Sequence, residues 1–145
     1  MKIRCKNLLV TGGAGFIGSN FIEYMLDKYE ELSIYNLDSL TYAGNLENTK
    51  NFNANPRYIF LKGDICDKEK VISIFKSHKI DGVINFAAES HVDNSISNPE
   101  LFIKTNVNGV LNLLNTALKF WFDSPFRCKE KYKNSRFHQI STDEV

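Results

Sequence analysis

The sequence predicts an α/β fold with a parallel, doubly wound sheet. Three observations lead to this prediction. Short apolar runs typical of buried strands alternate with segments whose apolar residues recur at helical spacing, the first run leads directly into a glycine-rich turn, and the chain contains no internal repeat. Alternation of strand and helix is typical of sheets built from right-handed β-α-β units. The 145 residues correspond to about one domain.

Each predicted element follows from its local pattern. Apolar runs predict five strands, at residues 7–11, 33–37, 57–62, 82–86 and 137–141. Helical spacing predicts three helices, at about residues 16–26, 68–78 and 99–122. Asp67 is expected to cap the second helix, and Pro99 suits the first turn of the third. An Asn-rich loop with at most a short helix is expected at 39–56, and a polar insert at 123–135.

The third predicted helix is apolar around most of its circumference, which indicates that it is covered on two sides. The sheet would cover one side, and a neighbouring helix or a second subunit would cover the other. The apolar positions are Phe102, Ile103, Val107, Val110, Leu111, Leu113, Leu114, Ala117, Leu118 and Trp121.

Composition excludes several classes of protein. The 18 Lys and Arg residues nearly balance the 17 Asp and Glu residues, so no positive field would attract nucleic acid or an anionic membrane. Cys5, Cys66 and Cys128 are far apart and form no CxxC pair, which argues against a disulfide framework or a metal site. No apolar run approaches the ~18 residues of a membrane span, and none suits a signal peptide. We therefore expect a soluble cytoplasmic protein.

The glycine-rich turn predicts a dinucleotide site of the Rossmann type. Gly12, Gly15 and Gly18 lie between a predicted strand and a predicted helix, the context in which such a loop can hold a diphosphate at a helix N-terminus. Asp38 follows Gly18 by 20 residues and ends the second strand, where a carboxylate accepts hydrogen bonds from ribose hydroxyls and repels a 2′-phosphate. NAD is therefore favoured over NADP. The alternative is a tight turn without a ligand.

Two further segments end predicted strands at the same edge of the sheet. Asp64 is either a cap or turn residue or a contact of the adenine. Ala87 and Ala88 could serve helix–sheet packing alone, but their small size beside the point where strand order reverses favours close approach of a cofactor.

Five segments resemble one known family. They are Thr11-Gly-Gly-Ala-Gly-Phe-Ile-Gly18, Asp38-Ser-Leu-Thr-Tyr-Ala-Gly-Asn-Leu46, Gly63-Asp-Ile65, Ala87-Ala-Glu-Ser-His-Val-Asp93 and Ser141-Thr-Asp-Glu-Val145. They are similar to the dTDP-glucose 4,6-dehydratase family of the extended short-chain dehydrogenase/reductase group. The second, fourth and fifth segments are the more specific ones.

The resemblance implies an NAD cofactor, a nucleotide-sugar substrate and a homodimer in the full-length protein. The residues that it places around NAD are Gly12, Gly15, Phe16, Ile17, Gly18, Asp38, Ser39, Leu40, Thr41, Asp64, Ile65, Phe86, Ala87, Ala88, Glu89, Ser90 and Thr105.

The resemblance also implies catalytic roles near the end of the chain. Asp143 would protonate the C6 hydroxyl of the sugar, Glu144 would remove the C5 proton, and Thr142 would contact the sugar O4. Ser90 would lie between cofactor and substrate. Without the resemblance, the Asp-Glu pair is better interpreted as solvated. Two departures, Ser39 for a usual Lys and Asn94 for a usual Arg, remove positive charge near the ligands.

The tyrosine–lysine pair of this enzyme group is not found in a suitable place. Tyr24 and Lys28 match the Tyr-x-x-x-Lys spacing in the first predicted helix, and Tyr58 and Lys62 match it in a strand, where the spacing is too extended. We interpret both as chance matches. Residues 1–145 are thus expected to be an incomplete NAD-binding domain without its C-terminal substrate region, inactive alone. The alternatives are a UDP-sugar epimerase or decarboxylase and a non-catalytic NAD-binding module.

Overall fold

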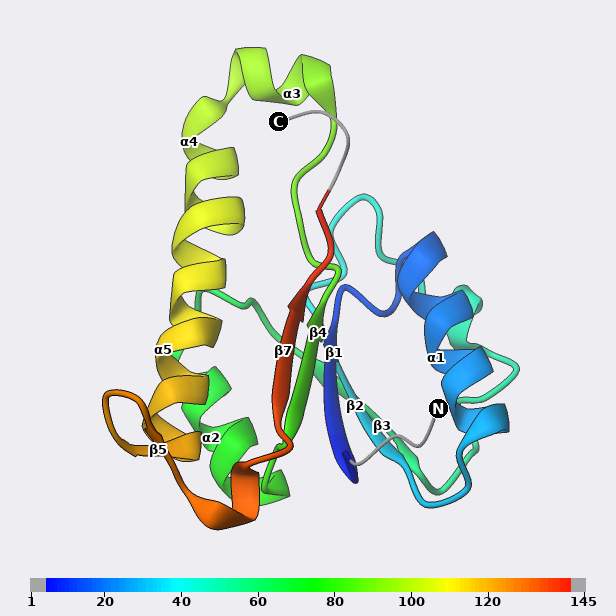
Figure 1. Cartoon of the computed structure of the whole chain (residues 1–145). Coiled ribbons are helices and arrows are strands. Elements are labelled where there is room, and N and C mark those ends of the chain that lie inside the picture. Colours follow the sequence, from blue (N-terminus) through cyan, green and yellow to red (C-terminus); the bar gives the residue numbers. More distant parts are fainter. Residues whose placement is uncertain (1–4, 142–145) are drawn as a thin grey trace.

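A five-stranded parallel sheet forms the centre of the protein and confirms the predicted fold class (Figure 1). The computed structural model describes residues 5–141, without the side chains of Val92 and Asn94. The strand order is β3-β2-β1-β4-β7. The strands are β1 (Asn7–Thr11), β2 (Ser33–Asp38), β3 (Tyr58–Lys62), β4 (Gly82–Asn85) and β7 (Arg136–Gln139). The order reverses between β1 and β4, so the loops that follow these two strands diverge and leave a crevice.

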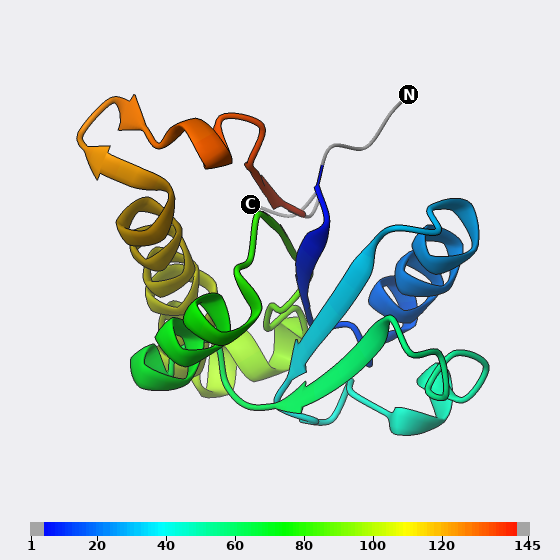
Figure 2. The same ribbon diagram turned by 90° about the horizontal axis from the view of Figure 1, so that it is seen from below.

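Helices cover both faces of the sheet (Figure 2). Helix α1 (Phe16–Lys28) lies on one face, and α2 (Lys68–His78) and α5 (Val110–Trp121) lie on the other. The side chains of β1 show why the strand is apolar throughout: Leu8 and Val10 pack in the cluster on the α1 side, whereas Leu9 packs in the cluster on the α2 and α5 side. Successive side chains of a strand point to opposite faces, so a sheet covered on both faces buries both sets.

The second helix begins as predicted. The Asp67 side chain accepts a hydrogen bond from the backbone N–H of Lys70 at 3.0 Å, which caps α2. The loop that follows β2 contains one short 3₁₀ helix, η1 (Leu46–Thr49), as the sequence allowed.

The long third helix differs from a regular α-helix. It begins as α4 (Pro99–Phe102), widens to a π-helical stretch, η2 (Ile103–Gly109), and continues as α5. Apolar spacing does not reveal such a stretch, because side-chain contacts outside the helix decide where the wider turns are favourable. One face of α5 is buried through Leu113, Thr116, Ala117 and Trp121, with the Trp121 indole donating to the carbonyl oxygen of Ile80 at 2.8 Å.

A second face of the same helix is exposed. We call it the outer stripe; it consists of Ile103, Val107, Leu111, Leu114 and Leu118, each between 39% and 57% exposed. The sequence predicted that this helix is covered on two sides. The sheet and α2 cover one face. The outer stripe is the second apolar face, and its cover stays a prediction. No helix within residues 5–141 has the length and the apolar character needed to cross a membrane.

The sequence did not predict several short elements in the loops. A six-residue helix, α3 (Val92–Ser97), precedes α4, and the polar insert forms a small hairpin of β5 (Phe122–Ser124) and β6 (Arg127–Cys128) followed by η3 (Glu130–Tyr132). The last strand of the large sheet covers 136–139 instead of 137–141. Elements of this length contain too few residues for a periodic apolar pattern to develop.

Arg57 joins the end of α1 to the start of β3. Its guanidinium donates to the carbonyl oxygens of Leu26, Tyr29 and Leu32 at 2.8, 2.7 and 3.2 Å. The last carbonyl groups of a helix have no partner within the helix, so this side chain satisfies groups that would otherwise depend on water.

We expect Arg57→Ala to lower the free energy of unfolding by about 2 kcal/mol, because several hydrogen bonds from a charged donor are lost. Arg57→Lys should recover only part of the loss, since an ammonium cannot reproduce the planar fork of the guanidinium. Urea unfolding followed by circular dichroism measures both effects. Arg127→Ala, at an exposed position in β6, is the control. Equal stabilities of the Arg57→Ala and control variants would contradict this role.

Candidate functional site

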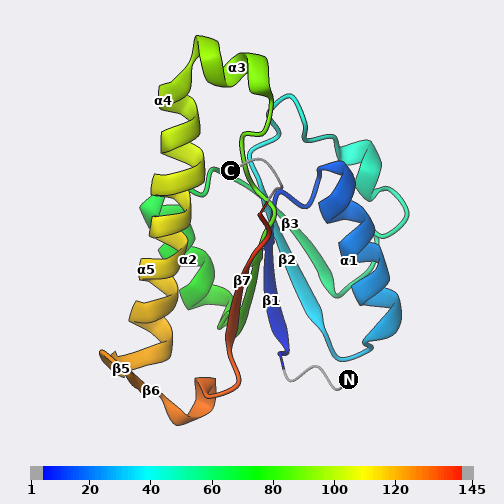
Figure 3. The same ribbon diagram turned by 45° about the horizontal axis from the view of Figure 1, so that its top comes forward.

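A pocket of about 450 Å³ lies at the carboxyl ends of the strands, where the strand order reverses. Figure 3 shows the loops after β1, β2 and β4 leaving this edge of the sheet, with α3 and α4 beyond it. The volume falls within the range of small-molecule and cofactor sites, roughly 300–1,000 Å³. In open α/β sheets, ligands bind at this location.

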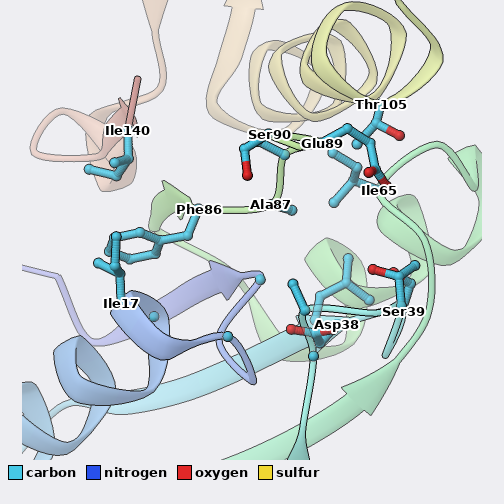
Figure 4. Close-up of a pocket in the computed structure, with 18 of the residues that line it drawn as sticks. Ile17, Asp38, Ser39, Ile65, Phe86, Ala87, Glu89, Ser90, Thr105 and Ile140 are labelled. Atoms are coloured by element: carbon cyan, nitrogen blue, oxygen red, sulfur yellow. The ribbon is translucent and has the colours of Figure 1, made fainter. Parts of the chain in front are cut away.

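The structure brings together nearly all residues predicted to contact the cofactor (Figure 4). Those that line the pocket are Gly12, Gly15, Phe16, Ile17, Gly18, Asp38, Ser39, Thr41, Asp64, Ile65, Phe86, Ala87, Ala88, Glu89, Ser90 and Thr105. Leu40 is not among the lining residues, and its contact with the cofactor stays a prediction. Its backbone turns to a φ of 56°, and its N–H donates to Asp38 Oδ1 at 2.8 Å, so it contributes to the pocket through Asp38.

The glycine turn runs against the loop that follows β4. Gly12 has a φ of 67°, and a Cβ atom there would lie 2.7 Å from the backbone nitrogen of Ala87. At Gly18, a Cβ atom would lie 2.4 Å from the carbonyl oxygen of Gly12. Any larger residue at either position would force the turn, the loop or helix α1 to move. These two glycines are therefore required by the protein's own packing before any ligand is considered.

The N-terminus of α1 faces the pocket without a side-chain cap. Gly15 precedes the helix and makes no capping contact, and Gly15, Phe16, Ile17 and Gly18 all line the pocket. The first N–H groups of a helix have no partner within the helix and carry partial positive charge, which favours an anion beside them. Phe16 and Ile17 are 80% and 65% exposed, as expected of apolar residues that a ligand could cover.

Asp38 is held rigidly at the end of β2. The residue is 7% exposed, and its carboxylate accepts hydrogen bonds from the N–H groups of Ala14, at 2.9 Å, and Leu40, at 2.8 Å. Each carboxylate oxygen thus has one protein donor and retains further acceptor capacity. The glycine turn and the acidic residue are linked directly through Ala14, which sets the distance between a bound diphosphate and this carboxylate.

Asp64 is a turn residue, the first of the two interpretations that the sequence left open, and its contact with adenine stays a prediction. Its Oδ1 accepts the N–H of Cys66 at 2.8 Å, as in an Asx turn, and the residue also lines the pocket. Burial, followed by the nearby charge of Asp64, raises the pKa of the Cys66 thiol to about 11. This thiol is uncharged at neutral pH, which leaves it a poor nucleophile beside the pocket.

The charged residues among the described lining residues of the pocket are all acidic. Asp38, Asp64 and Glu89 line it, and none of its described lining residues is Lys or Arg. An anionic ligand would consequently be held by backbone N–H groups and the helix terminus rather than by basic side chains.

Several supporting residues were not recognised from the sequence. Asn36 is fully buried and accepts the N–H of Gly13 at 3.0 Å while donating to the Tyr58 hydroxyl at 2.9 Å. Asn85 is also fully buried beneath the loop after β4. A signal was present, since an Asn inside an apolar strand must find hydrogen-bond partners. The further lining residues are Leu37, Ala43, Gly44, Gly63, Leu101, Ile140 and Ser141.

The predicted catalytic residues Thr142, Asp143 and Glu144 lie outside the described residues. Ile140 and Ser141, immediately before them, line the pocket. The chance Tyr-x-x-x-Lys matches do not lie there. The Lys28 ammonium contacts the Tyr24 hydroxyl on the exposed surface of α1, and the hydroxyl of Tyr58 is hydrogen-bonded to Asn36 within the protein.

Curated relatives of the chain are nucleotide-sugar enzymes. It is 47% identical over 140 residues to the dTDP-glucose 4,6-dehydratase of Neisseria gonorrhoeae, covering 97% of this chain and 39% of the relative. It is 48% identical over 138 residues to that of Escherichia coli, covering 95% of this chain and 37% of the relative. The chain thus spans about two-fifths of the length of these relatives.

Solved structures share the fold. The dTDP-glucose 4,6-dehydratase from Bacillus anthracis in complex with NAD superposes with a TM-score of 0.76 at 42% identity, covering 96% of this chain and 38% of that one. UDP-glucose 4-epimerase from Thermotoga maritima, with UDP-glucose, gives a TM-score of 0.69 at 34% identity, covering 79% of this chain and 34% of that one. The sequence pattern of the GDP-mannose 4,6 dehydratase family matches residues 9–145, and the chain belongs to this family.

Proposed function

We propose that the chain is the NAD-binding part of a dTDP-glucose 4,6-dehydratase. The observation that carries the proposal is the pocket, which joins an uncapped helix N-terminus, the carboxylate of Asp38 and the loop after β4 at the switch point of the sheet. The names and the extent of the similar enzymes support the proposal, since dTDP-glucose 4,6-dehydratases match nearly the whole chain.

The residues present fit NAD. The free N–H groups at the start of α1 suit a diphosphate, and the remaining acceptor capacity of Asp38 suits the hydroxyls of a ribose. A 2′-phosphate would place a second negative charge beside a buried carboxylate with no basic residue among the described lining residues. The pocket therefore favours NAD over NADP.

The proposed reaction combines oxidation, elimination and reduction on one sugar. NAD, held by the start of α1 and by Asp38, would supply the hydride chemistry of this reaction, which is oxidation at the sugar C4 and reduction at C6. In the chain itself, Asp143 would donate a proton to the departing C6 hydroxyl, Glu144 would take the C5 proton, and Thr142 would hold O4. Such adjacent carboxyl groups need different environments so that one is protonated and the other ionised. Ser90, at the pocket wall, would lie between cofactor and sugar.

We further propose that the full-length protein is a homodimer that buries the outer stripe. Five large apolar side chains follow one face of the helix from Ile103 to Leu118, and a helix apolar on two faces is normally covered on both. The resemblance to the family supports this proposal, since it implies a dimer bundle of helices of this type.

We expect Asp38→Ala to weaken binding of NAD by about tenfold or more, because charge-assisted hydrogen bonds are lost. The same change should narrow the preference for NAD over NADP, since the repulsive charge disappears. Isothermal titration calorimetry with both dinucleotides measures the two effects. Asp27→Ala, at an exposed position on α1, is the charge-matched control. A wild-type chain that binds NADP more tightly than NAD would contradict the proposal.

In the full-length enzyme that we propose, Glu144→Gln should stop the reaction after oxidation, because no base remains to remove the C5 proton. Reduced cofactor should then accumulate and be visible as absorbance of reduced nicotinamide. Asp143→Asn should slow elimination on the order of 10²–10⁴-fold, as expected for the loss of a general acid. Normal turnover by the Glu144→Gln variant would instead favour the epimerase alternative.

Light scattering tests the proposed dimer interface. The chain should associate as its concentration rises, because an exposed apolar stripe of this length is a favourable contact surface. Leu114→Glu with Leu118→Glu should shift the protein towards the monomer. Leu46→Glu, at an exposed apolar position on η1 outside the stripe, should leave association unchanged. A wild-type chain that stays monomeric at every concentration would rule the interface out.

A further inference from the structure

The loop between β4 and α3 forms one wall of the pocket. Residues Phe86–Ser90 line the pocket and have no regular backbone structure. Side chains from elsewhere hold the loop in place. At Ala87, the backbone N–H donates to Thr11 Oγ1 and the carbonyl oxygen accepts from Asn85 Nδ2, each at 3.3 Å.

Asn106 holds the same loop two residues later. The N–H of Glu89 donates to Asn106 Oδ1 at 2.8 Å, and Asn106 Nδ2 donates to the carbonyl oxygen of Glu89 at 2.8 Å. One amide side chain therefore pairs with both backbone groups of a single residue. Asn106 lies in the π-helical stretch η2, next to Thr105, which lines the pocket. Short π-helical stretches inside α-helices occur frequently at functional sites.

The two hydrogen bonds from Asn106 position Glu89, whose carboxylate has an oxygen without a hydrogen-bond partner. Glu89 is 7% exposed and lines the pocket on the same wall as Thr105 and Ile65 (Figure 4). Its Oε2 atom is buried and has no hydrogen-bond partner. A buried acceptor without a donor is energetically costly, and more so when it is charged, so such an atom points to a donor that arrives with a ligand.

We propose that Asn106 is a positioning residue, which holds Glu89 so that its carboxylate accepts a hydrogen bond from the bound dinucleotide. This inference rests on the proposed function. The diphosphate of a dinucleotide offers no donor, so the contact must be with a nucleoside portion, through a ribose hydroxyl or an amino group of the base. Asn106 itself does not touch the ligand; it acts through the backbone of Glu89.

A double-mutant cycle on NAD affinity tests this inference. Asn106→Ala should weaken binding of NAD by about threefold to tenfold, as expected when a neutral hydrogen bond loses its alignment. Asn108→Ala removes an exposed amide from the same helical stretch and should change the affinity little. Dissociation constants are measured by calorimetry well below the melting temperature of each variant, so that a change in stability alone does not alter them.

The second arm of the cycle distinguishes two roles of Asn106: positioning the Glu89 carboxylate, and supporting the shape of the whole loop. In a Glu89→Ala background the backbone contacts of Asn106 remain available but the acceptor is gone. Asn106→Ala should then have almost no further effect on NAD affinity. An undiminished loss in that background, or an unchanged affinity for Asn106→Ala alone, would overturn the inference. A wild-type chain that binds no NAD would instead refute the proposed function itself.

Discussion

The close approach of two loops at the switch point is the constraint on which the pocket depends. The turn after β1 and the loop after β4 leave neighbouring strands, and Gly12 brings their backbones so near that even a methyl group would collide with Ala87. Their contact forms the floor of the crevice, and their divergence beyond it opens the crevice. Helix α1 can begin at this point only because Gly18 also lies against Gly12. Sheet order, turn geometry and helix position are therefore one coupled arrangement.

The pocket would bind an anion although its charged side chains are acidic. This is physically consistent because the helix terminus provides fixed N–H groups whose orientation costs nothing at the moment of binding. The carboxylates would then determine specificity: they would accept hydrogen bonds from neutral hydroxyl or amino groups and oppose any additional phosphate. Affinity would come from the backbone, and specificity from Asp38 and its acidic neighbours.

Asparagines provide the scaffold beneath these groups, and two of them, Asn36 and Asn85, are fully buried. Asn36 supports the glycine turn, Asn85 joins β1 to β7 through contacts with Thr11 and Gln139, and Asn106 supports the loop after β4. An amide has both a donor and an acceptor, so it can satisfy backbone groups in irregular segments that no sheet or helix supplies. These residues explain how loops without regular structure keep a defined shape.

The sequence by itself determined the fold class, the elements with long apolar periods and the residue types around the pocket, because each of these depends on local spacing or on a glycine and an aspartate at fixed distances. Local sequence does not determine which residues of a motif line the pocket: Leu40 belongs to the same motif as Asp38, yet it is not among the lining residues. Only the tertiary structure decided the π-helical stretch and the partners of Asn36, Asn85 and Asn106. Apart from the Asn85–Ala87 hydrogen bond, those contacts join residues 17 to 74 positions apart, and which of them form depends on how the packed elements meet.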